Sequence, residues 1–200
     1  MTLTRSKKDL NSSVILSLSF YQRKTEQVAR DLLGKKLIRK LKDGTILSGY
    51  IVETEAYLGL KDKACHSYNH RKTPRTSVMY EAGGRAYIYL IYGMYNCLNV
   101  VTQTHGCPEA VLIRALEPVD GIELMQLKSR QINIHKILNG PGKLCKVLEI
   151  NKDLNRHDLT ESPLWIEQGF KVPPKQIKKS ARINIAYAEE WTSKPLRFTI

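Results

Sequence analysis

The sequence predicts a single domain of the α+β class in which β-strands outnumber helices. Its 200 residues suit one domain with a sizeable core, and 42% of them are hydrophobic, as in an ordinary globular protein. Two turn signals, Asp43-Gly44 and residues 92–95, each join two runs of strand-forming residues, which is typical of β-hairpins. No internal repeat and no convincing linker divides the chain.

The N-terminal part of the sequence indicates an arm, a helix and a hairpin. Residues 1–19 are expected to form a partly flexible arm, polar and frayed up to residue 13 and then docked on the domain that spans residues 20–200. Thr25 is expected to cap a helix that Gly34 ends, because the apolar residues between them recur at helical spacing. Residues 35–41 and 45–56 alternate as the two strands of a hairpin.

The middle of the chain combines a long loop with a tyrosine-rich hairpin. Residues 58–84 are basic and turn-rich, and long ordered loops are generally functional. In the hairpin of residues 85–101, four of the ten tyrosines fall within nine residues. Core packing accounts well for Tyr87. Tyr92 and Met94 lie at an expected exposed tip, where aromatic and apolar side chains can stack on bases or wedge between them.

The C-terminal half alternates strands and short helices. Residues 110–116 form a buried-looking strand that Glu117-Pro118 is expected to end, and residues 120–130 have the pattern of a helix. Another helix should open at residues 139–145 and run to about residue 150; its glycines and Lys143 make it a candidate phosphate seat. Further short strands are expected at residues 164–166, 181–185 and 196–199.

Two glutamates and a tyrosine at the end of the residue 45–56 strand are the first candidates for chemistry. Side chains on a strand alternate between faces, so Glu53, Glu55 and Tyr57 should share one face. Repulsion between the carboxylates, together with burial, would raise the pKa of one of them and suit it to act as a base. Two unrelated glutamates on a solvated strand end would show the same spacing, so the pattern alone leaves both interpretations open.

Arg114 lies in the middle of the apolar run of residues 110–116. Because a guanidinium cannot be neutralised, it needs a carboxylate or phosphate partner there, and Glu53 and Glu55 are the obvious candidates. A purely structural ion pair would explain Arg114 equally well.

Composition restricts the class of protein. The formal net charge of +13 is spread along the whole chain, which indicates a polyanionic partner, most commonly nucleic acid. The four cysteines contain no C-x-x-C pair, so no zinc finger or ribbon is predicted, and they fit reduced thiols of an intracellular protein. No run of about 18 apolar residues occurs, so no membrane span is predicted.

Six motifs resemble the alkyladenine (3-methyladenine) DNA glycosylase family. In chain order they are Glu53-Thr54-Glu55-Ala56-Tyr57, Ala64-Cys65-His66-Ser67, Arg71-Lys72-Thr73-Pro74-Arg75, Tyr87-Ile88-Tyr89-Leu90-Ile91-Tyr92-Gly93-Met94-Tyr95, Leu112-Ile113-Arg114-Ala115-Leu116-Glu117-Pro118 and Gly140-Pro141-Gly142-Lys143-Leu144. The similarity runs from about Phe20 to the C-terminus. It implies a curved, mainly antiparallel, open-barrel-like sheet with flanking helices and long loops.

The resemblance also implies roles for individual residues. Glu55 matches the general base that activates water, and Arg114 matches the arginine that helps to hold that water. The pocket for the flipped base is matched by Tyr57, Ala64, His66, Tyr89 and Asn99, of which Asn99 would exclude normal guanine by colliding with its amino group. The DNA contacts are matched by Tyr92, Met94, Arg71, Thr73 and Lys143, of which Tyr92 would fill the gap left in the duplex.

The implied activity is that of a monofunctional DNA repair glycosylase. It would flip alkylated or deaminated purines out of double-stranded DNA, hydrolyse the N-glycosidic bond and leave an abasic site. No metal, cofactor or membrane is expected, and the protein is expected to act as a monomer on DNA inside the cell. Two alternatives stay open: a non-catalytic nucleic-acid-binding module, and a glycosylase–lyase that uses a lysine imine.

Overall fold

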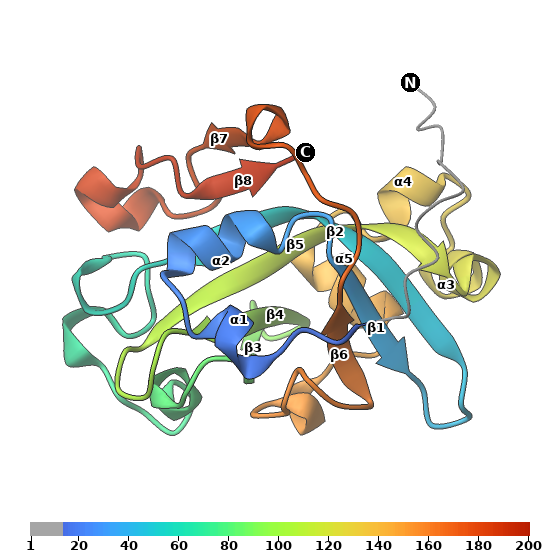
Figure 1. The fold of residues 1–200 in the computed structure, drawn as a ribbon, viewed down its shortest axis with the longest axis horizontal. Helices are drawn as coiled ribbons and strands as arrows, with labels where there is room; N and C mark the ends of the chain where they lie inside the picture. The colour runs from blue at the N-terminus through green and yellow to red at the C-terminus, as the bar shows by residue number, and fades with distance from the viewer. Residues whose placement is uncertain (1–13) are drawn as a thin grey trace.

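The computed structural model describes residues 14–200 and shows one α+β domain around a curled sheet (Figure 1). Within these residues, the strands pair in the order β3-β4-β5-β2-β1-β6, with β8 beside β2 and β7 beside β8, and each pairing is antiparallel. The predicted fold class is therefore confirmed. The strands are β1 (Lys36–Lys40), β2 (Ile46–Tyr57), β3 (Ala86–Ile91), β4 (Tyr95–Thr102), β5 (Glu109–Asp120), β6 (Leu164–Glu167), β7 (Lys178–Ser180) and β8 (Arg197–Thr199).

Short helices surround the sheet. The α-helices are α1 (Leu18–Tyr21), α2 (Thr25–Asp31), α3 (Ile122–Ser129), α4 (Ile134–Ile137) and α5 (Pro141–Val147). Short 3₁₀ helices lie in the connections, at Gly59–Lys61, Tyr68–His70, Ser77–Tyr80, Lys152–Leu154, Pro174–Gln176 and Ala186–Trp191. Among the helices of residues 14–200, none has the length and apolar character needed to cross a membrane.

Strand β2 is the element that curls the sheet. Its first half pairs with β1, its last residues pair with β8, and its other edge pairs with β5 throughout. The β2–β5 register shifts between Ile51 and Glu53 and again between Glu53 and Thr54. Such irregularities bend a strand and re-aim its side chains. The bend therefore falls where the sequence carries its two glutamates.

Glu117-Pro118 does not end β5, which continues to Asp120. Pro118 pairs with Gly49 of β2 at another register shift, where the missing proline N–H is tolerated. Gly49 allows this close crossing, because a Cβ on it would lie 2.8 Å from the Glu117 carbonyl oxygen. The sequence-based prediction placed the strand end too early because it could not see this partner.

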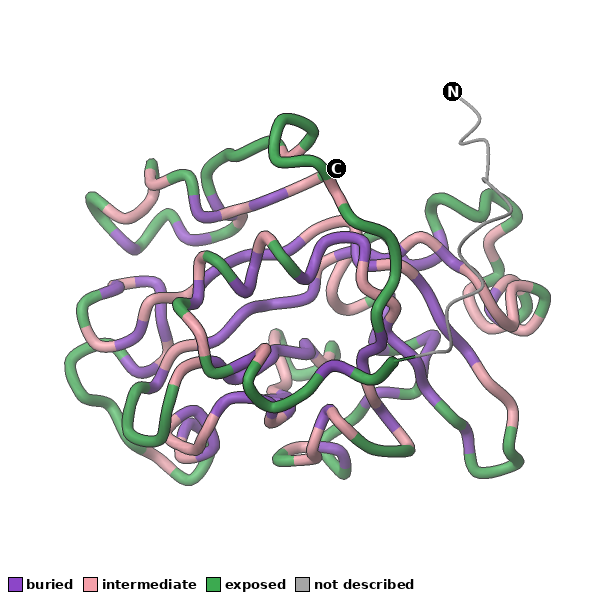
Figure 2. Tube along the Cα trace, viewed as in Figure 1, coloured by how far each residue is buried: buried purple, intermediate pink, exposed green. Residues whose placement is uncertain are grey.

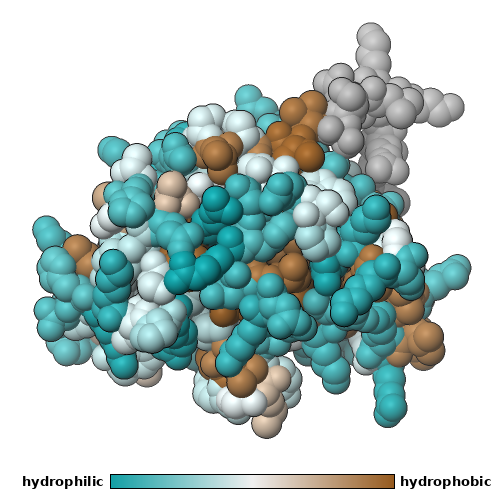
Figure 3. Space-filling model, turned by 90° about the horizontal axis from the view of Figure 1, so that it is seen from below, coloured by the Kyte–Doolittle hydropathy of each residue, from teal (hydrophilic) through white to brown (hydrophobic). Residues whose placement is uncertain are grey.

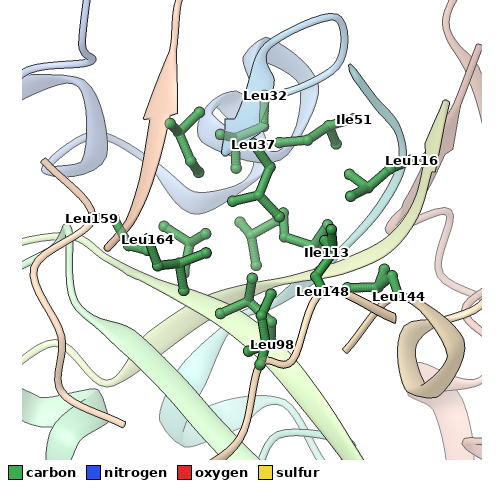
Figure 4. Close-up of a cluster of buried hydrophobic side chains, with 14 of the residues drawn as sticks. Leu32, Leu37, Ile51, Leu98, Ile113, Leu116, Leu144, Leu148, Leu159 and Leu164 are labelled. Atoms are coloured by element: carbon green, nitrogen blue, oxygen red, sulfur yellow. The ribbon is translucent and has the colours of Figure 1, made fainter. Parts of the chain in front are cut away.

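The main core lies on one side of the sheet, where leucines and isoleucines from the strands meet apolar residues from helices α2 and α5 and from the residues that follow them (Figure 4). Figure 2 shows buried residues running along β2 and β5, with exposed residues concentrated in the connections. Leu98, Ile113, Leu144 and Leu148 are each fully buried in this cluster. A second, smaller cluster, which includes Cys65, Val78 and Tyr87, packs beneath the long loop.

Helix α2 begins at Thr25, but Thr25 is not its cap. The N-cap position is Lys24, which makes no side-chain cap hydrogen bond. The Thr25 hydroxyl instead hydrogen-bonds to the hydroxyl of Thr102, at 2.7 Å, and to the carboxylate of Glu109. Because these partners lie on β4 and β5, burial of Thr25 ties the helix to the sheet, and this tertiary contact replaces the local one that the sequence suggested.

Other expected boundaries are also corrected. Residues 181–185 are not a strand; β7 ends at Ser180, and the following backbone turns toward the cavity described below. Helix α5 ends at Val147, earlier than expected. Within α3, Met125 is fully buried, whereas Leu127 is 76% exposed. The two hairpins, β1–β2 and β3–β4, are confirmed.

The described part of the N-terminal segment lies on the domain. Leu16 is buried, its N–H donates to the carbonyl of Ile166, and Ile15 forms an antiparallel bridge with Glu167. The expectation that residues 1–13 are frayed lies outside the described residues.

Core packing predicts a clear difference between two leucines. Leu98→Ala removes a fully buried side chain and leaves a cavity, so the free energy of unfolding should fall by about 2–5 kcal/mol. Leu127→Ala is the matched control, with an expected change of about 0.5 kcal/mol or less, because that side chain is 76% exposed. Urea unfolding measures both. Similar losses in the two variants would contradict the burial described here.

Candidate active site

A cavity of about 520 Å³ opens beside the end of β2. Its size lies within the range of small-molecule pockets, roughly 300–1,000 Å³. Its wall is built from the end of β2, the loop after it, the β3–β4 hairpin, the middle of β5, the start of α5 and residues 183–187. The face of the molecule seen in Figure 3 is mainly hydrophilic, with separate apolar patches between the polar side chains.

The two glutamates share a face of β2 as predicted, but they have different surroundings. Glu53 Oε1 accepts from Arg114 Nε at 2.9 Å and from Arg197 Nε at 2.6 Å. Glu55 is fully buried; its Oε2 accepts from the Tyr57 hydroxyl at 2.9 Å and faces Arg114 Nη1 at 3.4 Å. Glu53 is therefore the ion-pairing carboxylate, and Glu55 is the one next to the aromatic wall.

Arg114 reaches both carboxylates because of the irregular pairing of β2 and β5. Glu53 pairs with Ala115 and the next residue, Thr54, pairs with Ile113, so Arg114 has no paired residue on β2. The Arg114 side chain lines the cavity and is only 13% exposed. The ion pair expected from the sequence is thus confirmed with both glutamates.

Burial and charge act in opposite directions on these groups. Burial raises the pKa of Glu55, while Arg114, the N–H of Ile183 and the Tyr57 hydroxyl lower it; burial prevails, and repulsion from Glu53 is a smaller cause. For Arg114, burial lowers the pKa, but the neighbouring Glu55 and Glu53 outweigh it and raise the pKa overall. Glu55 is therefore a carboxylate with increased basicity that a permanent cation keeps close.

Three of the rings that line the cavity, those of His66, Tyr87 and Tyr89, lie against one another. The His66 ring lies 4.6 Å from the Tyr89 ring, centroid to centroid, at an interplanar angle of 77°. His66 Nδ1 is 2.8 Å from the hydroxyl of Tyr87, which fixes the imidazole in place. Tyr87 is 1% exposed, as expected of a core residue. Burial, followed by the charges of Arg75 and Arg71, lowers the pKa of His66 to about 4.

The remaining predicted pocket residues also line the cavity. Ala64 is held by its N–H, which donates to Asp62 Oδ1 at 3.0 Å. Asn99 is 4% exposed, and its amide nitrogen donates to the carbonyl of Tyr87 at 3.1 Å. The Asn99 side chain is therefore fixed by the backbone of the neighbouring strand.

The predicted DNA-contact residues divide into two groups. Tyr92 and Met94 are 72% and 67% exposed at the tip of the β3–β4 hairpin, and Tyr92 also lines the cavity, as does Lys143. Arg71 and Thr73 lie in the long loop and do not line the cavity. The structure thus places the hairpin tip and Lys143 at the cavity, with Arg71 and Thr73 outside its wall.

The sequence-based prediction missed one wall of the cavity. Ile183, Asn184, Ile185 and Tyr187 line it, and the N–H of Ile183 donates to Glu55 Oε1 at 2.8 Å. This hydrogen bond is one physical reason that residues 181–185 are not a strand. The sequence carries little signal for this wall, because polar residues are interspersed around Arg182 and Ile183 and no apolar run sets them apart as the run of residues 110–116 does for Arg114.

The cysteines and possible metal ligands add no further site. Cys65, Cys97 and Cys145 are buried free thiols, and Cys107 is an exposed one. Within residues 14–200, no group of three or more His, Cys, Asp or Glu side chains could hold a metal ion.

The fold and the site together define the class of the protein, which is a DNA glycosylase. An enzyme that acts on one base of a duplex must hold that base apart from its neighbours, and an aromatic cavity beside an exposed aromatic hairpin tip suits this task. A family model described as methylpurine-DNA glycosylase matches residues 19–200, and the chain belongs to this family. It is accordingly a DNA repair enzyme and a hydrolase of N-glycosyl bonds.

Several relatives are similar over most of the chain. A protein of Alkaliphilus oremlandii is 48% identical over 92% of this chain and 95% of its own length. The mouse and human proteins named DNA-3-methyladenine glycosylase are 44% and 42% identical over 92% of this chain. This chain covers 59% of the length of the mouse protein and 65% of that of the human protein.

The environment of His66 predicts its titration. With a pKa of about 4 in the folded protein, the imidazole should stay neutral down to about pH 5, where a free histidine, with a pKa near 6.5, is charged. Between about pH 4 and about pH 6.5 the imidazole is protonated in the unfolded chain but not in the folded protein. The free energy of unfolding therefore decreases as pH falls through this range. NMR of the imidazole measures the titration.

His66→Gln identifies the resonance and should flatten this part of the pH dependence of stability. A transition near pH 6.5 in the folded protein would contradict the buried, cation-flanked environment.

Proposed function

We propose that this protein removes alkylated or deaminated purines from double-stranded DNA by hydrolysis, with Glu55 as the base that activates water. The observation that carries the proposal is the network of Glu55, Arg114 and Tyr57 at the wall of a cavity large enough for one base. The relatives named DNA-3-methyladenine glycosylase support the same class of substrate.

The proposed chemistry follows from the positions of Glu55 and Arg114. Glu55 is fully buried, and Arg114 lines the cavity next to it, so a water bound to Arg114 on the cavity side would lie close to Glu55 and to the reacting sugar. The distance of 3.4 Å between Arg114 Nη1 and Glu55 Oε2 is long for a hydrogen bond, and such contacts often tighten only when substrate is bound. The ionised Glu55 would accept a proton from this water and stabilise the cationic sugar in the transition state.

Base recognition is proposed to rest on the aromatic rings and the backbone. Tyr57, His66 and Tyr89 all line the cavity and would stack on an extruded purine. Alkylated purines carry a positive charge, which electron-rich rings attract, whereas a deaminated purine is neutral and depends more on hydrogen bonds to its edge. The backbone of Ala64 and His66 would supply those bonds, and the fixed Asn99 would exclude the amino group of guanine.

DNA binding is proposed to use the hairpin tip together with cations around the cavity. Tyr92 would enter the gap that the flipped nucleotide leaves, with Met94 beside it, and Lys143, Arg71 and Thr73 would contact phosphates. We propose that the protein works as a monomer on genomic DNA inside the cell.

A lyase mechanism and a purely DNA-binding role are both less well supported. Lys143, the lysine that lines the cavity, is exposed at its mouth, where a phosphate is a better partner for it than a sugar carbon. A binding module would have no use for a buried glutamate held by an arginine and a phenol.

The role of Glu55 predicts a loss of chemistry without a loss of binding. Glu55→Gln keeps the shape of the side chain but cannot accept the proton, so base release in single-turnover assays should slow by about 10²–10⁴-fold. Affinity for a lesion-containing duplex, measured by fluorescence anisotropy, should change little.

Glu53→Gln is the matched control for this prediction, because it makes the same change two positions away on the same face. Its loss of activity should be much smaller, since Glu53 is occupied by Arg114 and Arg197. Retained turnover in Glu55→Gln would remove this residue from the mechanism.

The exposed tip predicts a separate effect on base flipping. Tyr92→Ala removes the ring that would replace the extruded base, so the flipping equilibrium, followed with a fluorescent base analogue, should weaken by about 1–3 kcal/mol. Tyr92→Phe retains the ring and should behave like the unmodified protein. An equal loss in both variants would show that the hydroxyl, and not the ring, is what matters.

A further inference from the structure

A buried ion pair lies behind the wall of the cavity. Arg182 donates from Nη1 to Asp62 Oδ2 at 2.6 Å and from Nη2 to Asp62 Oδ1 at 2.8 Å, and both side chains are fully buried. Neither residue lines the cavity. A two-pronged pair of this kind is geometrically rigid, and its desolvation is costly unless other contacts complete it.

The contacts that complete the pair connect it to the loop after β2. The carboxylate of Asp62 accepts the N–H groups of Leu58, at 2.9 Å, and of Ala64, at 3.0 Å. Arg182 Nη1 also donates to the carbonyl of Ala56 at 2.9 Å. The pair therefore fixes the backbone on both sides of Tyr57 relative to the segment that follows Arg182.

The guanidinium of Arg182 also lies against the Tyr57 ring. Its Cζ is 4.7 Å from the ring centroid, and its Nε has no hydrogen-bond partner among the described residues. Tyr57 lines the cavity and Arg182 does not, so the guanidinium contacts the ring from outside the cavity wall. The charge of Arg182 acts on the phenol: burial, Glu55 and Tyr89 raise the pKa of Tyr57, and Arg182 opposes them.

An aromatic ring that already meets a cation on one side attracts a second cation less strongly on the other. The attraction is electrostatic, through the negative charge of the ring faces, and two cations on opposite sides of one ring also repel each other. Burial shields this repulsion from dissolved salt. A positively charged base stacked on the cavity side of Tyr57 would experience both effects, and a neutral base neither.

We propose that Arg182, held by Asp62, is a positioning and specificity-determining residue that acts through Tyr57. It lowers the advantage that a positively charged alkylated purine has over a neutral deaminated purine in the cavity. The inference rests on the proposed function, because it concerns which damaged bases the same site accepts.

The test compares release of 3-methyladenine, which is cationic in DNA and lacks the amino group of guanine, with release of hypoxanthine, which is neutral. Arg182→Gln combined with Asp62→Asn removes both charges and keeps polar side chains in place. The ratio of kcat/KM for 3-methyladenine to that for hypoxanthine should rise about fivefold or more, in line with the strength of a cation–π contact. Because both values come from one preparation, a fraction of unfolded protein does not change the ratio.

Two further variants separate charge from structure. Arg182→Met combined with Asp62→Leu is a second neutral pair, and apolar replacement of a buried ion pair often preserves folding. It should shift the ratio in the same direction. Arg182→Lys keeps the charge but loses the two-pronged geometry, so it should slow release of both bases and leave the ratio unchanged.

An unchanged ratio in a folded neutral pair, or an equal shift in Arg182→Lys, would overturn the inference. Both outcomes leave the proposed function intact, provided that the unmodified protein releases both bases. If the unmodified protein releases neither base, the proposed function itself fails, and this inference fails with it.

Discussion

The contact of Arg114 with Glu53 and Glu55 is the constraint on which the site depends. A guanidinium with only 13% exposure cannot shed its charge, so the fold must bring a carboxylate to it. The register shift in the β2–β5 pairing does this: Arg114 has no paired residue on β2, and it lies beside the two glutamates at the position where β2 bends. Loss of Arg114 would leave the buried Glu55 without a cation, and removing one partner of a buried pair typically costs about 3–5 kcal/mol. The irregular pairing of β2 and β5 and the bend of β2 therefore accompany this arrangement of charges, whereas burial is what raises the pKa of Glu55 against the effect of Arg114.

A layered construction follows from this arrangement. Aromatic rings and Arg114 line the cavity, Glu55 is buried next to Arg114 and Tyr57, and the Arg182–Asp62 pair is buried outside the cavity wall, against Tyr57. In these buried surroundings the local dielectric is low, so each charge–charge contact acts more strongly than it would in solution. Hydrogen bonds from the backbone, such as the one from the Ile183 N–H to Glu55, fix the positions of these groups relative to one another. Such a wall is already organised before a base enters, which is what electrostatic stabilisation of a transition state requires.

Sequence patterns were sufficient where a structure depends on neighbours in the chain. The hairpins, the exposed tip at Tyr92 and the shared face of Glu53 and Glu55 depend on turn residues and on strand alternation, and these features are present. The patterns failed where the local structure depends on a partner that is distant in the sequence. Thr25 looked like a helix cap until its hydroxyl met Thr102 and Glu109, and residues 181–185 looked like a strand although Ile183 bonds a side chain 128 positions away. Both failures concern polar groups whose partners are far away in sequence, which alternation and helical spacing do not encode.

The overall charge and the buried charges act at different stages. A net charge of +13 draws the protein to a polyanion, but fields from exposed charges are screened within about 8 Å at physiological salt. The Glu55–Arg114 and Asp62–Arg182 networks are buried, so dissolved ions screen them far less. Ionic strength should therefore govern how often the protein meets DNA and leave the step at the sugar almost unaffected. The same separation fits the proposed function, in which a strongly basic protein would place a carboxylate near a positively charged base: the local charge at the cavity is set by a few paired groups and not by the net charge of the protein.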